Sequence, residues 1–181
     1  MTSRTMTLRT VWRFFLLFTL AACLLSGRAS AAPFVSPGGY SLALPAGWRA
    51  APNRIKGEDA AFYLPQPGSA PGTMMPNMNI RILPGACKMT LAAMKLYVNA
   101  NKKTLYSGMH LVSQTDSFLG GVRDVDIVLI DPQHGEPIHV HQIFALKSNS
   151  LYIISLGYSE DQHAQYEPVI LQMLASFRWK N

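Results

Sequence analysis

Two histidines placed two residues apart are the part of this sequence best suited to chemistry. They are His139 and His141, in the stretch EPIHVHQIFAL at positions 136–146. Side chains two apart in a β-strand point to the same face of the sheet, so the two imidazoles should lie side by side. Imidazole binds Zn²⁺ and Cu²⁺ and changes its charge near neutral pH. The two histidines can form a metal-binding or proton-transfer site if a third ligand or a carboxylate lies next to them.

The strand before the histidines supplies a candidate for that third group. The run DPQHGE at 131–136 predicts a hairpin turn. Pairing Asp131 with Glu136 gives a register in which Asp126 lies opposite His141 on one face, while the other face is apolar. A slip of one residue would mix the two faces, so the hydrophobic pattern favours this register.

Two interpretations of this hairpin remain open. His139, His141 and Asp126 could bind Zn²⁺ or Cu²⁺ with an open coordination position, or form a histidine–carboxylate pair that titrates near neutral pH. Alternatively they form a polar sheet surface, half covered by a helix, in which a cross-strand pair contributes well under ~1 kcal/mol. Because the spacing fixes no third ligand, we expect the structural role and keep metal binding as the alternative.

The sulfur-containing residues give a similar choice. Met74, Met75 and Met78 lie in the segment TMMPNM, and thioethers are soft ligands that select Cu(I). Methionine also fills gaps in cores, which is the role we expect here. Cys87 follows Pro84-Gly85, and we expect it to be buried and not reactive, since the sequence fixes no base beside it.

The first 31 residues have the features of a secretory signal peptide. Arg4, Arg9 and Arg13 precede the apolar run FFLLFTLAACLL, and an A-S-A motif ends at Ala31. The run is shorter than the roughly 20 apolar residues that span a bilayer. We therefore expect cleavage after Ala31, a single domain over 32–181 with no transmembrane span, and a periplasmic or extracellular location.

The same leader also matches a lipoprotein motif. Leu20-Ala21-Ala22-Cys23 resembles a bacterial lipobox, in which Cys23 would be acylated and become the first residue. Leu24 and Leu25 follow the cysteine at positions where polar residues are usual, which counts against this alternative. Contact with a membrane is expected only if Cys23 is lipidated, and both routes lead out of the cytoplasm.

Removal of the leader changes the charge. The chain has 16 basic and 10 acidic residues and a net charge of +6, and four arginines belong to the leader. The mature chain would keep 12 basic and 10 acidic residues, a net charge of +2. The remaining basic residues are scattered, so we expect no nucleic-acid partner. With Cys23 removed, Cys87 has no partner for an intramolecular disulfide.

Periodicity predicts an α+β domain. Alternating runs predict strands over 40–44, 60–65, 78–84, 110–118, 122–131, 137–147 and 150–158, and the stretch PQPGSAPGTMMPN at 65–77 predicts a loop. Thr90 can cap a first helix, and an apolar stripe from Tyr166 to Phe177 predicts a second, with Pro168 in its first turn. We expect a largely antiparallel sheet of about six to seven strands with helices packed on it.

Both ends of the mature chain resemble the PsbP/DcrB-like family. Tyr40 to Trp48, in GYSLALPAGWRAA, matches the aromatic-led strand that runs into Pro-x-Gly-Trp, and Ser176-Phe177 matches the end of that family's last helix. The resemblance covers residues 34–179. It implies an extracytoplasmic α/β/α sandwich and a non-catalytic accessory or binding role, as in lumenal PsbP of photosystem II and bacterial envelope lipoproteins. It carries over no functional residue.

These observations favour one function over two others. The chain contains neither G-x-S-x-G nor H-E-x-x-H, and we expect no catalytic residue and no cofactor. The leading hypothesis is an exported, non-enzymatic accessory protein that binds a partner protein or another component of the cell envelope. The alternative is a periplasmic protein that handles zinc or copper through His139 and His141, with Asp126 or the methionines. An enzyme comes third.

Overall fold

The computed structural model describes residues 33–51, 56–68, 75–86, 89–132 and 137–180, all within the unit Ala31–Asn181. The predicted leader lies outside these residues, together with its cleavage position after Ala31 and the alternative lipidation site Cys23. Met74 and Cys87 also lie outside them, so their predicted roles stay predictions.

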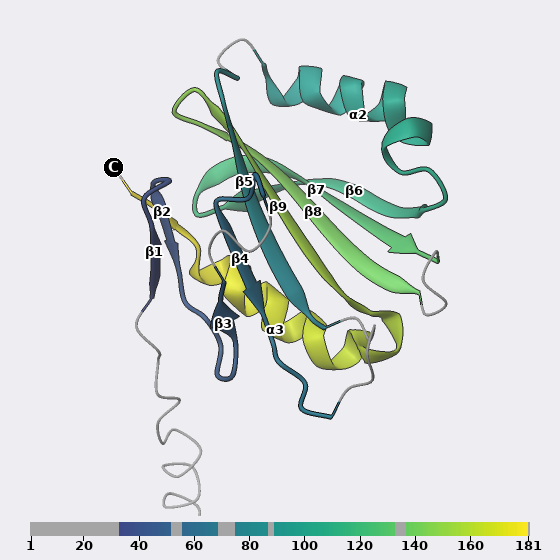
Figure 1. Ribbon diagram of the computed structural model, residues 1–181. Coiled ribbons are helices and arrows are strands. Elements are labelled where there is room, and N and C mark those ends of the chain that lie inside the picture. The colour runs from purple at the N-terminus through teal and green to yellow at the C-terminus, as the bar shows by residue number, and fades with distance from the viewer. Residues whose placement is uncertain (1–32, 52–55, 69–74, 87–88, 133–136, 181) are drawn as a thin grey trace, which may run out of the picture. The chain divides into compact units, whose positions relative to one another are not determined.

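The described residues form an antiparallel sheet of seven strands in the order β3-β4-β5-β9-β8-β7-β6 (Figure 1). Its strands are β3 (Arg49–Ala50), β4 (Ala60–Tyr63), β5 (Asn77–Pro84), β6 (His110–Leu119), β7 (Val122–Asp131), β8 (Ile138–Lys147) and β9 (Ser150–Ser159). A second sheet joins β1 (Phe34–Ser36), β2 (Tyr40–Leu42) and β10 (Arg178–Trp179). The predicted α+β class and antiparallel sheet are confirmed.

Two helices connect and follow the strands. Helix α2 (Leu91–Leu105) begins as predicted, because the Thr90 hydroxyl accepts a hydrogen bond from the Ala93 amide. A 3-10 turn, η1 (Glu160–Gln162), leads directly from β9 into helix α3 (His163–Ser176). Because α3 begins three residues before Tyr166, Pro168 lies inside the helix and not in its first turn, so that part of the prediction was wrong.

The long strands are joined by tight turns that require a left-handed backbone. Gly120 and Gly121 have φ of 56° and 84° between β6 and β7, and Ser148 and Asn149 have φ of 49° and 63° between β8 and β9. Two successive residues with positive φ make the two-residue turn whose twist matches an antiparallel hairpin. These turns belong to the β6–β7 and β8–β9 hairpins and help to set their registers.

The helices cover opposite faces of the seven-stranded sheet. Along β8, Ile143 and Ala145 pack in one core cluster with residues of α3, while Phe144 packs in a second cluster with residues of α2. Side chains alternate between the faces of a strand, so these two clusters are separated by the sheet. The sandwich therefore has an α3 face and an α2 face.

The two sequence motifs that suggested this fold are in contact with each other. The Tyr40 ring stacks on Phe177 with 5.1 Å between centroids, and both side chains are fully buried. The Ser176 hydroxyl accepts a hydrogen bond from the Ala43 amide at 2.9 Å. Trp48 packs in the same core cluster as α3, as expected. These contacts fasten the end of the chain to its first strands.

Candidate functional site

The two histidines of β8 lie on the α3 face and are almost completely buried. His139 is 7% exposed and His141 is 4% exposed. The sequence predicted that both point to one side, which they do, but that side was expected to be a sheet surface only half covered by a helix. The strand β9 and the start of α3 enclose it instead.

The predicted register of the β7–β8 hairpin was wrong by two residues. Asp131 pairs with Ile138, and Asp126 lies opposite Ile143, not opposite His141. A shift of two keeps each side chain on its predicted face, so Asp126 and His141 still lie on the same side of the sheet. The Asp126 Oδ1 reaches His141 Nδ1 diagonally at 3.6 Å, which is close enough for an ion pair but too long for a hydrogen bond.

Helix α3 adds two ionisable residues that the sequence analysis did not select. Glu167 Oε2 accepts a hydrogen bond from the Tyr158 hydroxyl at 2.5 Å and lies 3.2 Å from His141 Nε2. His163, one helical turn before Glu167, places its Nδ1 3.8 Å from the same oxygen. The spacing H-x-x-x-E in the sequence could have indicated this pair, because residues four apart share one face of a helix.

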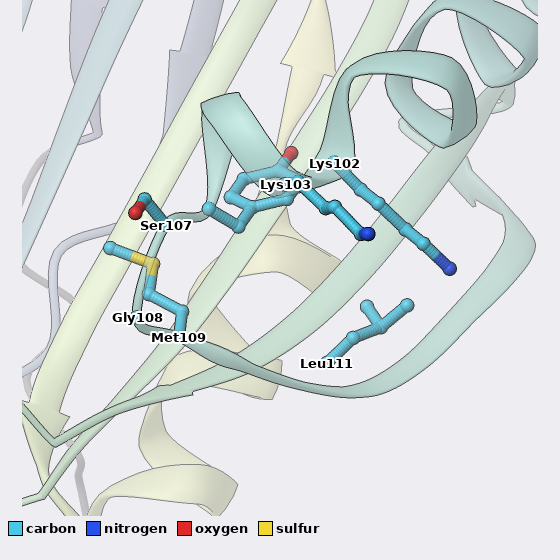
Figure 2. Close-up of a pocket in the computed structure, with 7 residues that line it drawn as sticks. Lys102, Lys103, Ser107, Gly108, Met109 and Leu111 are labelled. Carbon is cyan, nitrogen blue, oxygen red and sulfur yellow. The ribbon is translucent and has the colours of Figure 1, made fainter.

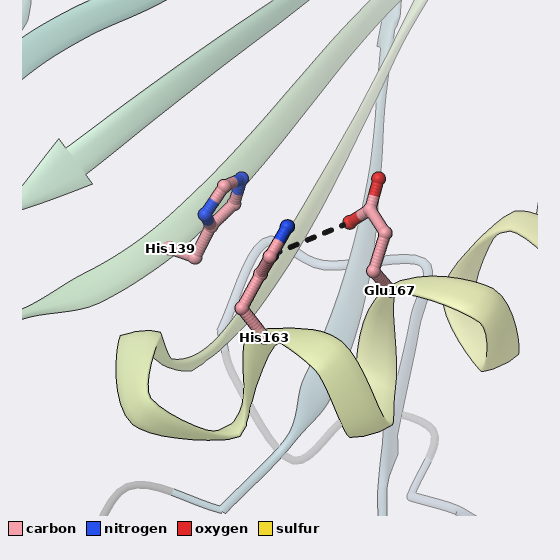
Figure 3. Close-up of side chains that lie close together, drawn as sticks. All are labelled: His139, His163 and Glu167. Carbon is pink, nitrogen blue, oxygen red and sulfur yellow. Dashed lines mark ion pairs between the residues drawn. The ribbon is translucent and has the colours of Figure 1, made fainter.

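His139 is held by an acid from η1. Its Nδ1 lies 2.7 Å from Glu160 Oε2. The imidazole also stacks between aromatic rings, with centroid separations of 4.4 Å to His163, 5.2 Å to Tyr158 and 5.2 Å to His141. Figure 3 shows His139 on its strand and His163 and Glu167 on α3, with their side chains directed toward one another. We call His139, His141, Tyr158, Glu160, His163 and Glu167 the histidine cluster.

Burial and charge act against each other in this cluster. Burial disfavours a charged imidazole, but Asp126 and Glu167 together outweigh it and raise the pKa of His141 above its ordinary value. Burial also disfavours ionised Glu167, yet the hydrogen bond from Tyr158 and the nearby His141 and His163 lower the pKa of Glu167. Burial, with the Glu167 carboxylate, raises the pKa of Tyr158. At neutral pH the cluster therefore holds an ionised Glu167 that accepts from a neutral phenol.

A second acid of β7 is buried on the same face. Asp124 is 2% exposed, and its Oδ1 has no hydrogen-bond partner among the described residues. Burial, followed by the charges of Asp126 and Asp116, raises the pKa of the Asp124 carboxyl to about 6. The α3 face thus carries both the histidine cluster and a carboxyl that titrates near neutral pH.

Of the methionines considered as ligands, Met75 and Met78 lie within the described residues. Met78 is buried in the core cluster of the α3 face, where it acts as a packing residue. Met75 lies at the described end of the 65–77 loop, and Met109 lines a groove on the other side of the sheet. In the described part of the chain, a group of histidine and carboxylate side chains that could hold a metal consists of His139, His163 and Glu167.

The groove lies between the end of α2 and the start of β6 and has a volume of about 340 Å³ (Figure 2). Its lining residues are Lys102, Lys103, Tyr106, Ser107, Gly108, Met109 and Leu111. Two ammonium groups border a partly apolar floor, an arrangement suited to binding and without a nucleophile–base pair. In the residues described, no helix combines the length and hydrophobicity needed to cross a membrane.

Comparison with known proteins finds similarity in structure only. No family model matches the chain, and no curated protein matches its sequence. The solved structure of LpqN, involved in cell envelope biogenesis of Mycobacterium tuberculosis, matches with a TM-score of 0.60 at 15% identity, over 86% of this chain and 88% of that one.

Two further structures share the architecture. Cyanobacterial PsbP (CyanoP) from Synechocystis sp. PCC 6803 matches with a TM-score of 0.57 at 14% identity, over 86% of this chain and 95% of that one. The Ran-binding protein Mog1p of Saccharomyces cerevisiae matches with a TM-score of 0.53 at 11% identity, over 83% and 96%. The protein therefore has the PsbP-like fold, as its two terminal motifs predicted.

Proposed function

We propose that this chain is an exported, non-enzymatic accessory protein of the cell envelope that acts by binding another envelope component. The observation that carries the proposal is the outward face of α2. Leu96 and Tyr97 on this helix are 70% and 57% exposed, while Met94 and Val98 on its other side are buried. Exposed large apolar residues that lie together are a mark of an interaction surface.

The edge strand next to the end of α2 also exposes apolar side chains. Leu111 and Val112 at the start of β6 are about half exposed, and Leu111 also lines the groove beside Lys102 and Lys103. We call α2 together with residues 109–112 the α2 surface. Strand β6 is an edge of the sheet, so its outer backbone groups can also pair with a partner.

The charge of the α2 surface restricts what it can bind. Helix α2 carries Lys95, Lys102 and Lys103 and no acidic residue. Lys95 pairs with Asp116 of β6, whereas Lys102 and Lys103 border the groove. A fitting partner presents acidic groups next to apolar ones, because opposite potentials across an interface favour association.

Two further observations support the location and the class of function. The leader resembles a secretory signal peptide, and a structural neighbour, LpqN, is involved in cell envelope biogenesis. The neighbours include a protein named for binding another protein, Mog1p. A shared fold alone does not define a function, so these points only add to the argument from the α2 surface.

Site-specific photocrosslinking in living cells tests the proposal. A photoreactive amino acid is placed at Tyr97 on α2 and, as a matched control, at Gln172, which is exposed on α3. We expect a discrete crosslinked product from position 97 that is absent from position 172 and is lost in a Leu96→Asp variant. Identical patterns from both positions, or no product from position 97, would contradict the proposal.

The location is tested separately on the same cells. Cell fractionation and the mass of the purified chain distinguish a mature protein that begins at Ala32 from one acylated at Cys23. An intact leader on a chain that stays in the cytoplasm would rule out an envelope role even if a crosslink formed.

A further inference from the structure

Three side chains of the histidine cluster are arranged as ligands of a metal ion. His139, His163 and Glu167 each offer one ligand atom, and these atoms all lie within 4.8 Å of one another (Figure 3). They come from two elements, β8 and α3, that pack together through the core of the sandwich. This arrangement differs from the set His139, His141 and Asp126 that the sequence suggested.

The spacing of the two helical residues suits a shared ion. His163 and Glu167 are four residues apart at the start of α3 and therefore lie on one face of the helix. Metal sites on helices use such i, i+4 pairs because both side chains can reach one ion. The side chain of His163 is 42% exposed, so it can move and solvent can reach the site.

His139 is already oriented for coordination. Its Nδ1 is 2.7 Å from Glu160 Oε2, so Nδ1 carries the proton in this contact and Nε2 keeps its lone pair for a ligand bond. A histidine that ligates a metal usually has its other ring nitrogen held by a carboxylate in this way. Glu167 is oriented as well, by Tyr158 at 2.5 Å and by His141 at 3.2 Å.

From this geometry we propose that His139, His163 and Glu167 bind a divalent transition-metal ion, and Zn²⁺ is the ion with which the site is tested. Two imidazoles and one carboxylate form a donor set typical of zinc sites that keep an open fourth position. Glu160, His141 and Tyr158 act as positioning residues around the three ligands. The proposal is independent of the proposed envelope function, since it concerns the α3 face and not the α2 surface.

Binding requires one local rearrangement. The rings of His139 and His163 are stacked, with 4.4 Å between centroids and 20° between planes. A ligated metal lies in the plane of each imidazole, and two nearly parallel rings cannot share it in that position. His163, as the exposed partner, must rotate out of the stack so that the planes of both rings can contain the same ion. This rotation gives the proposal a spectroscopic signature.

Zinc titration of the purified protein tests the site. The full chain is expressed, the product is purified, stripped with EDTA and titrated with ZnCl₂ by calorimetry. We expect one ion per chain, and we expect His163→Ala and Glu167→Gln to weaken binding by at least about 100-fold. His110→Ala is the control, because this exposed histidine lies on β6, outside the histidine cluster. Nitrogen-15 spectra of the imidazoles should show zinc-dependent shifts at His139 and His163 and none at His110.

Substitutions of the neighbouring acids Glu160 and Asp161 distinguish the orienting of His139 by Glu160 from the general effect of removing one negative charge. Glu160→Gln removes the carboxylate that holds His139 and should weaken zinc binding by about 10- to 100-fold. Asp161→Asn makes the same charge change one residue away, at an exposed side chain, and should leave binding within about 2-fold. Both variants keep His139, and their circular dichroism and melting in EDTA confirm that they are folded.

Three results would overturn the proposal. They are a wild-type chain that binds no Zn²⁺ at micromolar concentrations, a His163→Ala variant that binds as tightly as wild type, and equal losses from Glu160→Gln and Asp161→Asn. The same titration with Cu²⁺ ranks the two ions. Cu²⁺ binds nitrogen and oxygen donors more strongly than Zn²⁺ in general, so tighter binding of Cu²⁺ at the same three residues is the expected result and supports the site.

Discussion

The two faces of the sheet bury very different side chains. Under α2 the sheet buries the apolar side chains Val125, Ile127, Leu129 and Phe144, and at the end of this face it also buries Asp131 and Ser159. Under and beside α3 it presents Asp124, Asp126, His139, His141 and Tyr158 together with apolar residues. Ionisable groups lose hydration when they are buried, so the α3 face is the more costly one to build.

The outer surfaces of the two helices show the opposite contrast. Helix α2 covers an apolar face yet exposes Leu96 and Tyr97 to solvent, while α3 supplies His163 and Glu167 to a polar cluster at its edge. A helix with apolar residues on both sides is suited to an external partner. The contrast agrees with the two proposals, in which the α2 surface binds a partner and the α3 face holds a metal ion, and four predictions test it.

The largest expected effect concerns how tightly α3 is docked. Ile170 is fully buried in the core cluster, whereas its neighbour Leu171 is about half exposed. Ile170→Ala should lower the free energy of unfolding by about 2 to 5 kcal/mol, because it leaves a cavity against the sheet. Leu171→Ala should change it by less than about 0.5 kcal/mol. Urea denaturation measures both, and equal losses would mean that α3 does not pack through this side.

The second prediction concerns the buried charge of the α3 face. The carboxyl of Asp124 has a pKa raised from 3.8 to about 6, so its ionised form disfavours the folded state. The contribution of the Asp124 carboxyl to the free energy of unfolding is greatest below pH 3.8. This contribution falls as the pH rises from 3.8 through about 6. The size of the fall is about 3 kcal/mol, since one pKa unit corresponds to about 1.4 kcal/mol.

Asp124→Asn removes this dependence. The free energy of unfolding of the variant, relative to wild type, should therefore rise by about 3 kcal/mol between about pH 3.5 and about pH 7. Asp161→Asn, at an exposed site on η1, should show little change over the same range. A difference that stays constant with pH would show that Asp124 is solvated and that the α3 face tolerates its charge.

How far the sequence alone could describe the molecule depends on the range of the interaction. The strands from 110 to 158 and the helix capped by Thr90 follow from patterns within a few residues, and the structure confirms them. The register of the β7–β8 hairpin was missed because a shift of two residues preserves the hydrophobic pattern, so that pattern could not exclude it.

The site was less predictable than the fold. His139 and His141 could be identified as a pair on one face, because strand alternation is local. Their partners Glu160, His163 and Glu167 lie 21 to 26 residues away from the histidines they contact, and only the packing of α3 against β8 and β9 brings them there. The H-x-x-x-E spacing was visible in the sequence, but it does not say which strand the helix covers.

The third prediction compares one tyrosine on each face. Tyr158 donates to the Glu167 carboxylate at 2.5 Å on the α3 face, and Tyr106 donates to the Gln142 amide oxygen at 2.8 Å on the α2 face. Hydrogen bonds to charged groups contribute about 1.5 to 3 kcal/mol and neutral ones about 0.5 to 1.5 kcal/mol. Tyr158→Phe should therefore destabilise more than Tyr106→Phe in denaturation with EDTA present. An equal or larger loss from Tyr106→Phe would remove the energetic distinction between the faces.

The smallest effect tests whether α2 is held independently of the rest of the sandwich. This helix buries only Met94 and Val98 among its described side chains, so its first hydrogen bonds should matter to its local stability. Thr90→Ala removes the cap on the Ala93 amide and should cost about 1 kcal/mol. Amide hydrogen exchange should then be about 5-fold faster along α2 and unchanged along α3, because local opening of a weakly packed helix does not require global unfolding.

Thr104→Ala, near the other end of α2, controls for the loss of a threonine hydroxyl and should leave the exchange rates of both helices unchanged. Faster exchange in α3 as well would show that the two faces unfold together and that the α2 surface is not a separate unit.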